Sequence, residues 1–240
     1  MKKYNLVVVG GGLTGVASAV SAAREGLSVL LVERSGGLGG ALNNSLVYPF
    51  MPYTTKLKDG TKKYLSAGLF SEMRSKHDKY YVADNELHFI TEYFKFALDE
   101  MVMESKVDVL FHAVLSGVNT NDSKINSVIL TTKSGKMEIE SDFFIDATGD
   151  GDLFYLAGCE YQLGRESDGF CQPMTTCFRV SGINEEVFYK DIKMMQEKYK
   201  EYKAEGRLSN PRENILMFAG IGDGVIHFNT TRVIKHNPVD

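Results

Sequence analysis

Two kinds of apolar pattern alternate along the first part of the chain. Residues 4–9 and 27–33 are short, β-branched apolar runs, which is typical of strands buried on both faces. Between them, residues 14–25 carry apolar side chains at helical spacing and end before Gly26, a residue type that often terminates helices. This pattern predicts a strand, a helix and a second strand that runs parallel to the first.

The same two patterns predict the remaining elements. Residues 43–84 lack clear periodicity, so we expect an excursion from the sheet there. A helix over 92–105 and a strand over 107–112 follow. Short alternating runs over 114–140 predict an antiparallel meander, and residues 143–147 return to a buried strand. Toward the C-terminus the pattern predicts a strand, a helix and two further strands, over 175–180, 185–204, 215–219 and 225–229.

These elements together predict an α/β protein. A length of 240 residues is enough for one or two domains. We expect residues 1–172 to form a Rossmann-like domain with a central parallel sheet, a small antiparallel meander and the excursion at 43–84. Residues 173–240 would then form part of an α+β substrate or cap domain.

The amino-acid composition mainly excludes classes of protein and of binding partner. The 27 basic and 31 acidic residues give a net charge of −4, so no basic excess is present to bind nucleic acid. Three cysteines are too few for a secreted disulfide framework, which favours a cytoplasmic location. Four glycines within residues 10–15 interrupt the apolar N-terminal run, so we expect no membrane segment.

Glycine is the residue type that points to a function. Nine of the 23 glycines lie within the first 40 residues, and the run GGGLTG from Gly10 onward fits the pattern G-x-G-x-x-G. Gly10 allows a tight turn, Gly12 lets a pyrophosphate approach the backbone, and Gly15 lets the helix pack against the sheet. The N–H groups at the start of the helix, around Leu13 and Thr14, suit that anion.

Glu33 completes the pattern, because it ends the second predicted strand 18 residues after Gly15. A carboxylate at that place accepts hydrogen bonds from both hydroxyls of an adenosine ribose and repels a 2′-phosphate. We therefore expect a dinucleotide-binding site. This unit alone leaves NAD and FAD open as the dinucleotide.

Further motifs resemble those of FAD proteins. Residues 32–34 followed by Gly39-Gly40 resemble the E-R-x(n)-G-G extension of the glutathione-reductase-like flavoproteins with two dinucleotide-binding domains. Residues 144–153 resemble the A-T-G strand end of that group. Segments within 157–175 and 227–233 are similar to one branch, the bacterial FAD-dependent oxidoreductases related to the flavin subunit of heterodisulfide reductase.

The resemblance implies FAD as a non-covalent cofactor and assigns residues to its parts. The glycine motif, Glu33 and Arg34 would hold the ADP half, while the second glycine pair would pass near the pyrophosphate and ribityl chain. Residues after the strand at 107–112 would meet the adenine. The complete set of expected cofactor-binding residues is Gly10, Gly12, Leu13, Thr14, Gly15, Glu33, Arg34, Gly39, Gly40, Ala41, Ala113, Val114, Gly149 and Asp150.

The residues that would act on a substrate carry a weaker signal. Arg165 or Arg232 would clamp a carboxylate or sugar hydroxyls, and His227 would relay a proton near neutral pH. The alternative interpretation is an Arg165–Glu166 surface pair and a half-buried strand histidine. We expect no metal, because the three cysteines show no C-x2-C spacing.

The leading functional hypothesis is an FAD-dependent oxidoreductase that transfers hydride or electrons between FAD and a small organic substrate. One alternative is an NAD-dependent dehydrogenase. The other is a non-catalytic dinucleotide-binding fragment of a larger or split flavoprotein, because the C-terminal segment of the resembling family has no counterpart here. The oligomeric state stays open, with a homo-oligomer as one option.

Overall fold

A computed structural model describes residues 3–239 of the chain. The chain divides into two compact units. The first unit takes the residues up to Ser45 together with Met51–Val82 and Ile90–Tyr161. The second unit takes Leu46–Phe50, Ala83–Phe89 and the residues from Gln162 onward. Leu46–Phe50, within the expected excursion, and Ala83–Phe89, which begins at its end, thus belong to the second unit. The expected domain division after residue 172 stays a prediction.

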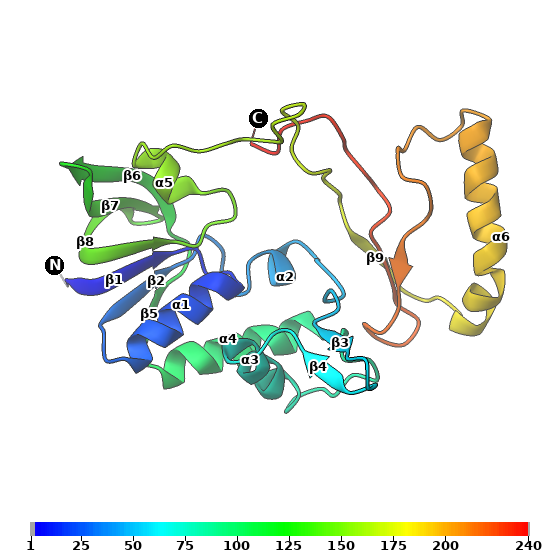
Figure 1. Ribbon diagram of the computed structural model, residues 1–240, viewed down its shortest axis with the longest axis horizontal. Coiled ribbons are helices and arrows are strands. Elements are labelled where there is room, and N and C mark those ends of the chain that lie inside the picture. Colours follow the sequence, from blue (N-terminus) through cyan, green and yellow to red (C-terminus); the bar gives the residue numbers. More distant parts are fainter. Residues whose placement is uncertain (1–2, 240) are drawn as a thin grey trace. The chain divides into compact units, whose positions relative to one another are not determined.

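A six-stranded sheet in the order β5-β2-β1-β8-β7-β6 organises the first unit (Figure 1). Strand β1 runs parallel to β2 on one side and to β8 on the other, and β2 runs parallel to β5. The predicted α/β class with a Rossmann-like parallel sheet is confirmed. The strands are β1 (Tyr4–Val9), β2 (Val29–Val32), β5 (Asp108–Leu110), β6 (Val114–Asn121), β7 (Lys124–Thr132) and β8 (Gly135–Asp146).

Strand β8 joins the parallel and antiparallel parts of the sheet. It pairs antiparallel with β7 over its first half and parallel with β1 over its second half. The sequence pattern predicted two separate elements here, whereas the chain forms one strand of 12 residues. Its alternation also corrects the expectation of a fully buried run at 143–147, because Phe144 packs on the core while Phe143 is 70% exposed.

Helices α1 (Leu13–Arg24) and α4 (Thr91–Glu104) lie on one side of the parallel strands (Figure 1). Helix α1 buries four residues, Gly15, Val16, Ala19 and Val20, in agreement with the predicted helical spacing. The remaining elements of the unit are helices α2 (Ala41–Asn44), α3 (Leu69–His77) and α5 (Asp152–Leu156), and the hairpin of β3 (Thr54–Lys56) and β4 (Lys62–Tyr64).

Helix α3 was missed because three of its four buried residues, Arg74, Lys76 and His77, are charged or polar, and only Met73 is apolar. Lys76 is buried against α4, where its Nζ donates to both carboxylate oxygens of Glu104 at 2.7 Å. His77 is fully buried and its Nε2 accepts a hydrogen bond from the Ile90 N–H at 3.0 Å. A helix that buries paired charges shows no apolar stripe in its sequence, so periodicity does not reveal it.

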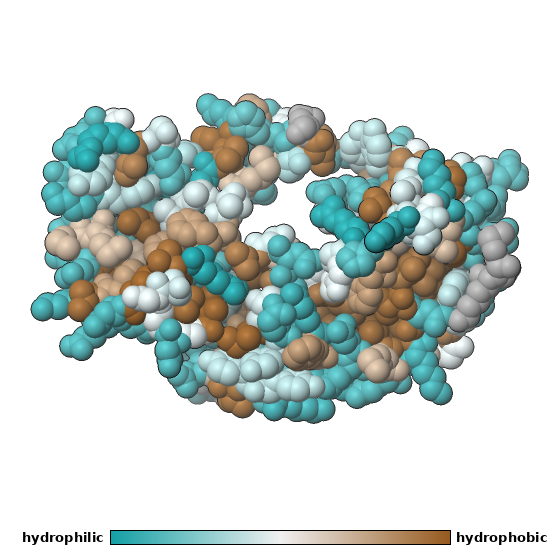
Figure 2. Space-filling view, turned by 180° about the vertical axis from the view of Figure 1, so that it is seen from behind, coloured by the Kyte–Doolittle hydropathy of each residue, from teal (hydrophilic) through white to brown (hydrophobic). Residues whose placement is uncertain are grey.

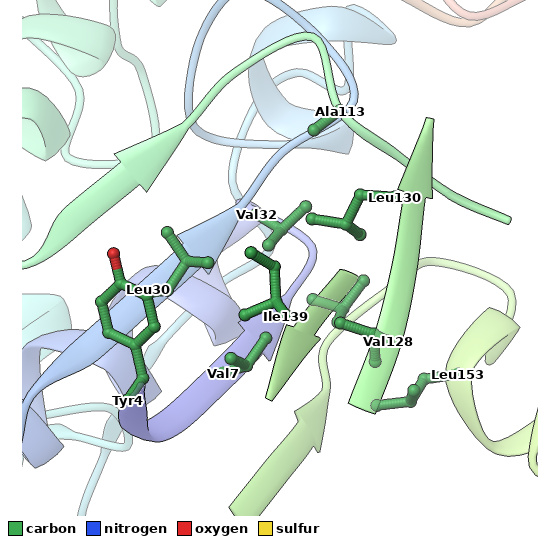
Figure 3. Packing of buried hydrophobic residues seen from close by; sticks show 10 residues of the cluster. Tyr4, Val7, Leu30, Val32, Ala113, Val128, Leu130, Ile139 and Leu153 are labelled. Carbon is green, nitrogen blue, oxygen red and sulfur yellow. The ribbon is translucent and has the colours of Figure 1, made fainter. Parts of the chain in front are cut away.

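An apolar cluster packs between the parallel strands β1 and β2 and the antiparallel strands β7 and β8 of the meander (Figure 3). Side chains of β1 and β2 meet those of β7 and β8 there, and Leu153 of α5 joins them. The alternate residues of β1 face the side of α1, so both faces of the strand are buried. The buried members of the cluster are Tyr4, Val7, Val9, Leu30, Val32, Ala113, Val128, Leu130, Ile139 and Leu153.

The second unit contains a three-stranded antiparallel sheet in the order β10-β11-β9 and one long helix. The helix α6 spans Glu185–Ala204, as the sequence pattern predicted, and begins at Asn184, whose side chain accepts a hydrogen bond from the Val187 N–H. The three strands are shorter than predicted: β9 (Phe178–Val180), β10 (Met217–Phe218) and β11 (Ile226–Phe228).

The surface in Figure 2 is largely hydrophilic, with hydrophobic residues gathered in patches between the polar ones. Among residues 3–239, no helix is both long and apolar enough to span a bilayer.

Candidate functional site

A cleft of about 420 Å³ opens at the carboxyl ends of β1, β2 and β8 in the first unit. Ligands of open α/β sheets bind at this end of the strands, and the volume lies within the usual range for ligand pockets. The residues that line the cleft are Val9, Gly10, Gly12, Val32, Glu33, Arg34, Gly40, Ala41, Asn44, Ser45, Ala113, Val114, Leu115, Ala147, Thr148, Gly149, Asp150 and Asp152.

Packing requires glycine at two positions, Gly10 in the turn after β1 and Gly15 in the first turn of α1. Gly10 has a φ of +103°, and a Cβ on it would lie 2.4 Å from the carbonyl oxygen of Ala147. A Cβ on Gly15 would lie only 1.8 Å from the carbonyl oxygen of Gly10. Both contacts are with backbone, which cannot move aside. The two glycines therefore hold α1 tightly against the turn and against the end of β8.

Gly12 differs from these two glycines because the space beside it is open. Its φ of −67° is available to any residue, and the nearest atom to an added Cβ would be the Cα of Gly40 at 3.9 Å. Gly12 lines the cleft and is the N-cap of α1, and within the described residues no side chain caps this helix end. The first N–H groups of α1 and the positive end of its dipole thus lie at the cleft.

A second glycine loop packs against the first one. The Gly39 N–H donates to the carbonyl oxygen of Gly11 at 2.8 Å, and Gly40 has a φ of +52°. A Cβ on Gly40 would lie 2.9 Å from the Cα of Gly12. Because both loops lack side chains, their backbones meet directly and both remain exposed to the cleft.

Glu33 forms part of the cleft wall at the end of β2. Its side chain is buried, with Oε2 accepting from the Gly11 N–H and Oε1 from the Ser35 N–H, both at 2.7 Å. The Ala113 N–H donates to the Glu33 carbonyl oxygen at 3.1 Å. Each carboxylate oxygen accepts one bond from the chain and keeps a second acceptor position. The carboxylate is therefore fixed in place and still able to accept from a ligand.

Replacing Glu33 by glutamine should therefore destabilise the first unit and weaken its ligand binding. The amide NH₂ would face either the Gly11 or the Ser35 N–H, so one buried donor loses its acceptor, which costs about 2 kcal/mol. Urea unfolding monitored by circular dichroism measures this loss. The control is the exposed Glu25→Gln, which should change the free energy of unfolding by less than about 0.5 kcal/mol. Equal effects of the two substitutions would contradict the bonding of Glu33.

Asp146 orders the opposite wall and was not among the expected site residues. Its Oδ1 accepts from the N–H and the hydroxyl of Thr148, at 2.9 and 2.7 Å. Its Oδ2 accepts from the N–H groups of Leu153 and Phe154 at the start of α5, at 2.9 and 3.0 Å. One carboxylate thus fixes the loop that presents Gly149 and Asp150 to the cleft. The signal for it is the aspartate that directly precedes the A-T-G strand end.

The structure brings ten of the fourteen expected cofactor-binding residues to the cleft wall. They are Gly10, Gly12, Glu33, Arg34, Gly40, Ala41, Ala113, Val114, Gly149 and Asp150. Leu13, Thr14, Gly15 and Gly39 belong to the same two loops and the first turn of α1 without lining the cleft. The eight other residues of the cleft wall were not in the expected set: Val9, Val32, Asn44, Ser45, Leu115, Ala147, Thr148 and Asp152. The cofactor-binding role of the whole set stays a prediction.

The three expected catalytic residues lie in the second unit. Arg165 donates from its Nε to Asp168 Oδ1 at 3.0 Å. The partner of Arg165 is therefore Asp168 and not Glu166, which corrects the first part of the alternative interpretation. Arg232 Nη1 lies 3.6 Å from Glu213 Oε2. His227 on β11 is fully buried rather than half-buried, which corrects the second part of that alternative. Their catalytic roles stay predictions.

Burial also sets the charge of His227. Desolvation lowers the pKa of its imidazole to about 4, and the nearby positive charge of Arg179 contributes. The ring is therefore neutral at neutral pH, with one N–H donor and one acceptor nitrogen.

Acidification should consequently destabilise the second unit. Between pH 6.5 and about 4 the unfolded chain binds a proton at His227 that the folded chain does not, so stability falls as the pH falls through this window. The loss amounts to about 3 kcal/mol. Urea unfolding of the natural protein and of His227→Gln at pH 7 and pH 4 measures it. The variant should lose less on acidification by about that amount, and an unchanged loss would show that His227 titrates normally.

The fold and the cleft define a dinucleotide-binding α/β protein, and comparison with known proteins identifies its family. The family described as FAD dependent oxidoreductase matches residues 5–237. The chain belongs to this family of redox enzymes, whose cofactor is FAD. Among curated proteins it is 33% identical to the mitochondrial dihydrolipoyl dehydrogenase of Schizosaccharomyces pombe, over 32% of this chain and 17% of that protein.

Two solved structures resemble the fold over most of the chain. A geranylgeranyl bacteriochlorophyll reductase-like protein from Thermoplasma acidophilum aligns with a TM-score of 0.55 and 16% identity, over 95% of this chain and 56% of its own. The aromatic hydroxylase CabE of angucycline biosynthesis aligns with a TM-score of 0.57 and 11% identity, over 98% of this chain and 44% of its own. The chain thus spans about half the length of these structures and 17% of the curated relative.

Proposed function

We propose that this protein binds FAD non-covalently in the cleft of the first unit and acts as an FAD-dependent oxidoreductase on a small organic molecule. The observation that carries the proposal is the uncapped start of α1, with the bare backbones of Gly12 and Gly40 facing the same cleft. A pyrophosphate needs such a place, since it takes hydrogen bonds from backbone N–H groups and is stabilised by the helix dipole. The residues present fit the cofactor of the family.

Each wall of the cleft supplies one kind of contact. Gly12 and Gly40 would hold the pyrophosphate, and the fixed carboxylate of Glu33 would accept from the ribose hydroxyls. Backbone groups of Ala113 and Val114 would meet the adenine, next to the residue that binds the ribose. The loop at Gly149 would line the cofactor from the opposite side. When bound, FAD supplies the hydride or electron transfer, while the chain binds, orients and shields it from water.

The glycine loops and Glu33 also fit NAD, which remains the second candidate for the cleft. The family membership favours FAD, because the family as a whole uses it. A third candidate is a non-catalytic dinucleotide-binding part of a larger or split flavoprotein, since the chain spans only part of the length of its relatives.

We further propose a cytoplasmic location, a small-molecule substrate and no nucleic-acid partner, on the cysteine content and the net charge of −4. A homo-oligomer is compatible with these proposals.

A competition experiment separates the two dinucleotides. The purified chain is equilibrated with FAD, and bound flavin is measured by its visible absorbance after removal of free cofactor. We expect saturable uptake of FAD that a tenfold excess of NADH does not displace. Uptake of NADH in preference to FAD would overturn the proposal in favour of the dehydrogenase.

A further inference from the structure

The hairpin of β3 and β4 carries a positive charge that contrasts with the rest of the chain (Figure 1). Residues 54–64 contain four lysines and one aspartate, which gives a net charge of +3. Since the whole chain has a net charge of −4, the remaining residues together carry −7. A local excess of positive charge on an acidic protein indicates a surface that meets an anionic partner. The lysines are Lys56, Lys58, Lys62 and Lys63.

The fold of the hairpin does not account for this charge. Strand register puts Lys56 directly opposite Lys62, and like charges in such a pair are destabilising. Lys56, Lys58 and Lys63 are exposed and form no ion pair with any residue of 3–239. Lysines that cost stability and have no partner within the chain are explained by a partner outside it.

An exposed apolar side chain lies at the tip of the hairpin among these lysines. Leu57 is 44% exposed and stands between Lys56 and Lys58 in the sequence. Asp59 closes the turn, where its Oδ1 accepts from the Thr61 N–H at 2.9 Å. A leucine flanked by lysines suits the surface of a bilayer, because the leucine enters the acyl boundary while the lysines reach the headgroups.

The base of the hairpin carries an exposed tyrosine and is fixed to the first unit. Tyr64 is 57% exposed, and Nζ of Lys62 lies 5.1 Å from the centroid of its ring. Tyr53 packs edge-on against the Phe70 ring of α3 at 5.0 Å. Tyr64 ends the three-residue strand β4, so it lies about 10 Å behind the turn. With Leu57 in the acyl boundary, Tyr64 would lie at the level of the headgroups, where tyrosine is enriched.

We propose that this hairpin binds the surface of a bilayer that contains anionic lipids, with Leu57 inserted and the four lysines at the headgroups. The charge of the hairpin complements such a surface. An acidic polypeptide or a nucleic acid also matches the lysines but offers no hydrocarbon layer for Leu57. The contact would hold the protein at a membrane surface without a spanning helix, which agrees with the proposed cytoplasmic location. It does not depend on the cofactor.

Co-sedimentation of the whole chain with lipid vesicles tests the proposal. The probes are vesicles of phosphatidylcholine alone and vesicles in which about one third of the lipid is phosphatidylglycerol. We expect saturable binding to the phosphatidylglycerol vesicles, at least about tenfold tighter than to phosphatidylcholine alone. Added salt should weaken it, because ions screen exposed lysines. No binding to the phosphatidylglycerol vesicles, or equal binding to both kinds, overturns the proposal.

Two triple variants of equal charge change locate the contact on the chain. The first replaces three hairpin lysines by glutamine and should weaken binding to the phosphatidylglycerol vesicles about 100-fold. The second replaces three exposed lysines of the meander in the same unit and should bind like the natural protein. Equal losses in the two variants overturn the proposal. The substitutions are Lys56→Gln, Lys58→Gln and Lys63→Gln in the first variant, and Lys124→Gln, Lys133→Gln and Lys136→Gln in the second.

Insertion of the tip is measured separately by fluorescence. The chain contains no tryptophan, so Leu57→Trp introduces a single reporter at the turn. Its emission should shift to shorter wavelength on the phosphatidylglycerol vesicles. Met103→Trp is the control, because Met103 on α4 is 75% exposed and lies outside the hairpin, and its emission should not shift. Equal shifts of the two reporters overturn the proposal. Binding of polyglutamate without a shift of the Leu57→Trp reporter on vesicles would assign the hairpin to an acidic polypeptide and overturn it as well.

Discussion

Replacement of Gly12 by alanine is expected to weaken FAD binding at least about 100-fold and to leave the fold intact. A Cβ at this position meets no atom of the described chain closer than 3.9 Å, and the φ of −67° suits alanine. The added methyl group would occupy the part of the cleft where the pyrophosphate approaches the backbone. The loss corresponds to about 2.7 kcal/mol of binding free energy. Titration by flavin fluorescence measures the affinity, and thermal unfolding measures the stability.

Gly37→Ala is the matched control for this substitution. Gly37 lies in the same unit and does not line the cleft, and a Cβ there would make only an ordinary contact with Lys95 at 3.8 Å. Its affinity for FAD should equal that of the natural protein. Equal affinities of the Gly12→Ala and Gly37→Ala variants would show that the cofactor does not approach Gly12.

Gly15→Ala should have the opposite effect, a large loss of stability. The added Cβ would lie 1.8 Å from the carbonyl oxygen of Gly10 and 3.3 Å from the Cβ of Ala147, so α1 must move away from the turn and from the end of β8. Forcing a buried backbone contact apart in this way is expected to cost about 3 kcal/mol or more. Urea unfolding measures the cost, with Gly37→Ala again as control. An unfolding midpoint equal to that of the control would contradict the close packing at Gly15.

The parts of the fold that the sequence predicted are those with local and periodic signals. Strand β1 has the predicted bounds because its side chains are apolar except for Asn5 and a glycine follows at once. Helix α6 also has the predicted bounds, since Asn184 caps its start and a continuous helical spacing runs to Ala204. Signals of this kind are contained within the element itself, so they do not depend on tertiary contacts.

The parts that were missed depend on contacts distant in sequence. Helix α3 buries Lys76 against glutamates of α4, 24 and 28 residues away, and nothing local indicates that pairing. Leu46–Phe50 belongs to the second unit because Tyr48 packs on His227 and bonds to Ala219, 171 residues away. Neither contact leaves a periodic pattern in the chain.

The candidate functional residues likewise include some with a local sequence signal and some without one. The cleft was predictable because strand ends and glycine loops carry their own signature, from Gly10 to Glu33 and again at Gly149. The pairing of His227 with Arg179 across the small sheet of the second unit was not predictable. Arg179 stands in a short strand with no motif of its own, and only the strand register shows that it lies opposite His227.

A crystal structure of the chain co-crystallised with FAD tests most directly whether the cleft of the first unit holds the cofactor. We expect the pyrophosphate at the start of α1, within hydrogen-bond distance of the backbone N–H groups around Gly12 and Gly40. We also expect the adenosine ribose on the carboxylate of Glu33, with the adenine beside Ala113. FAD bound elsewhere on the chain, or a cleft that stays free of FAD at saturating concentration, would contradict the assignment of this cleft to the cofactor.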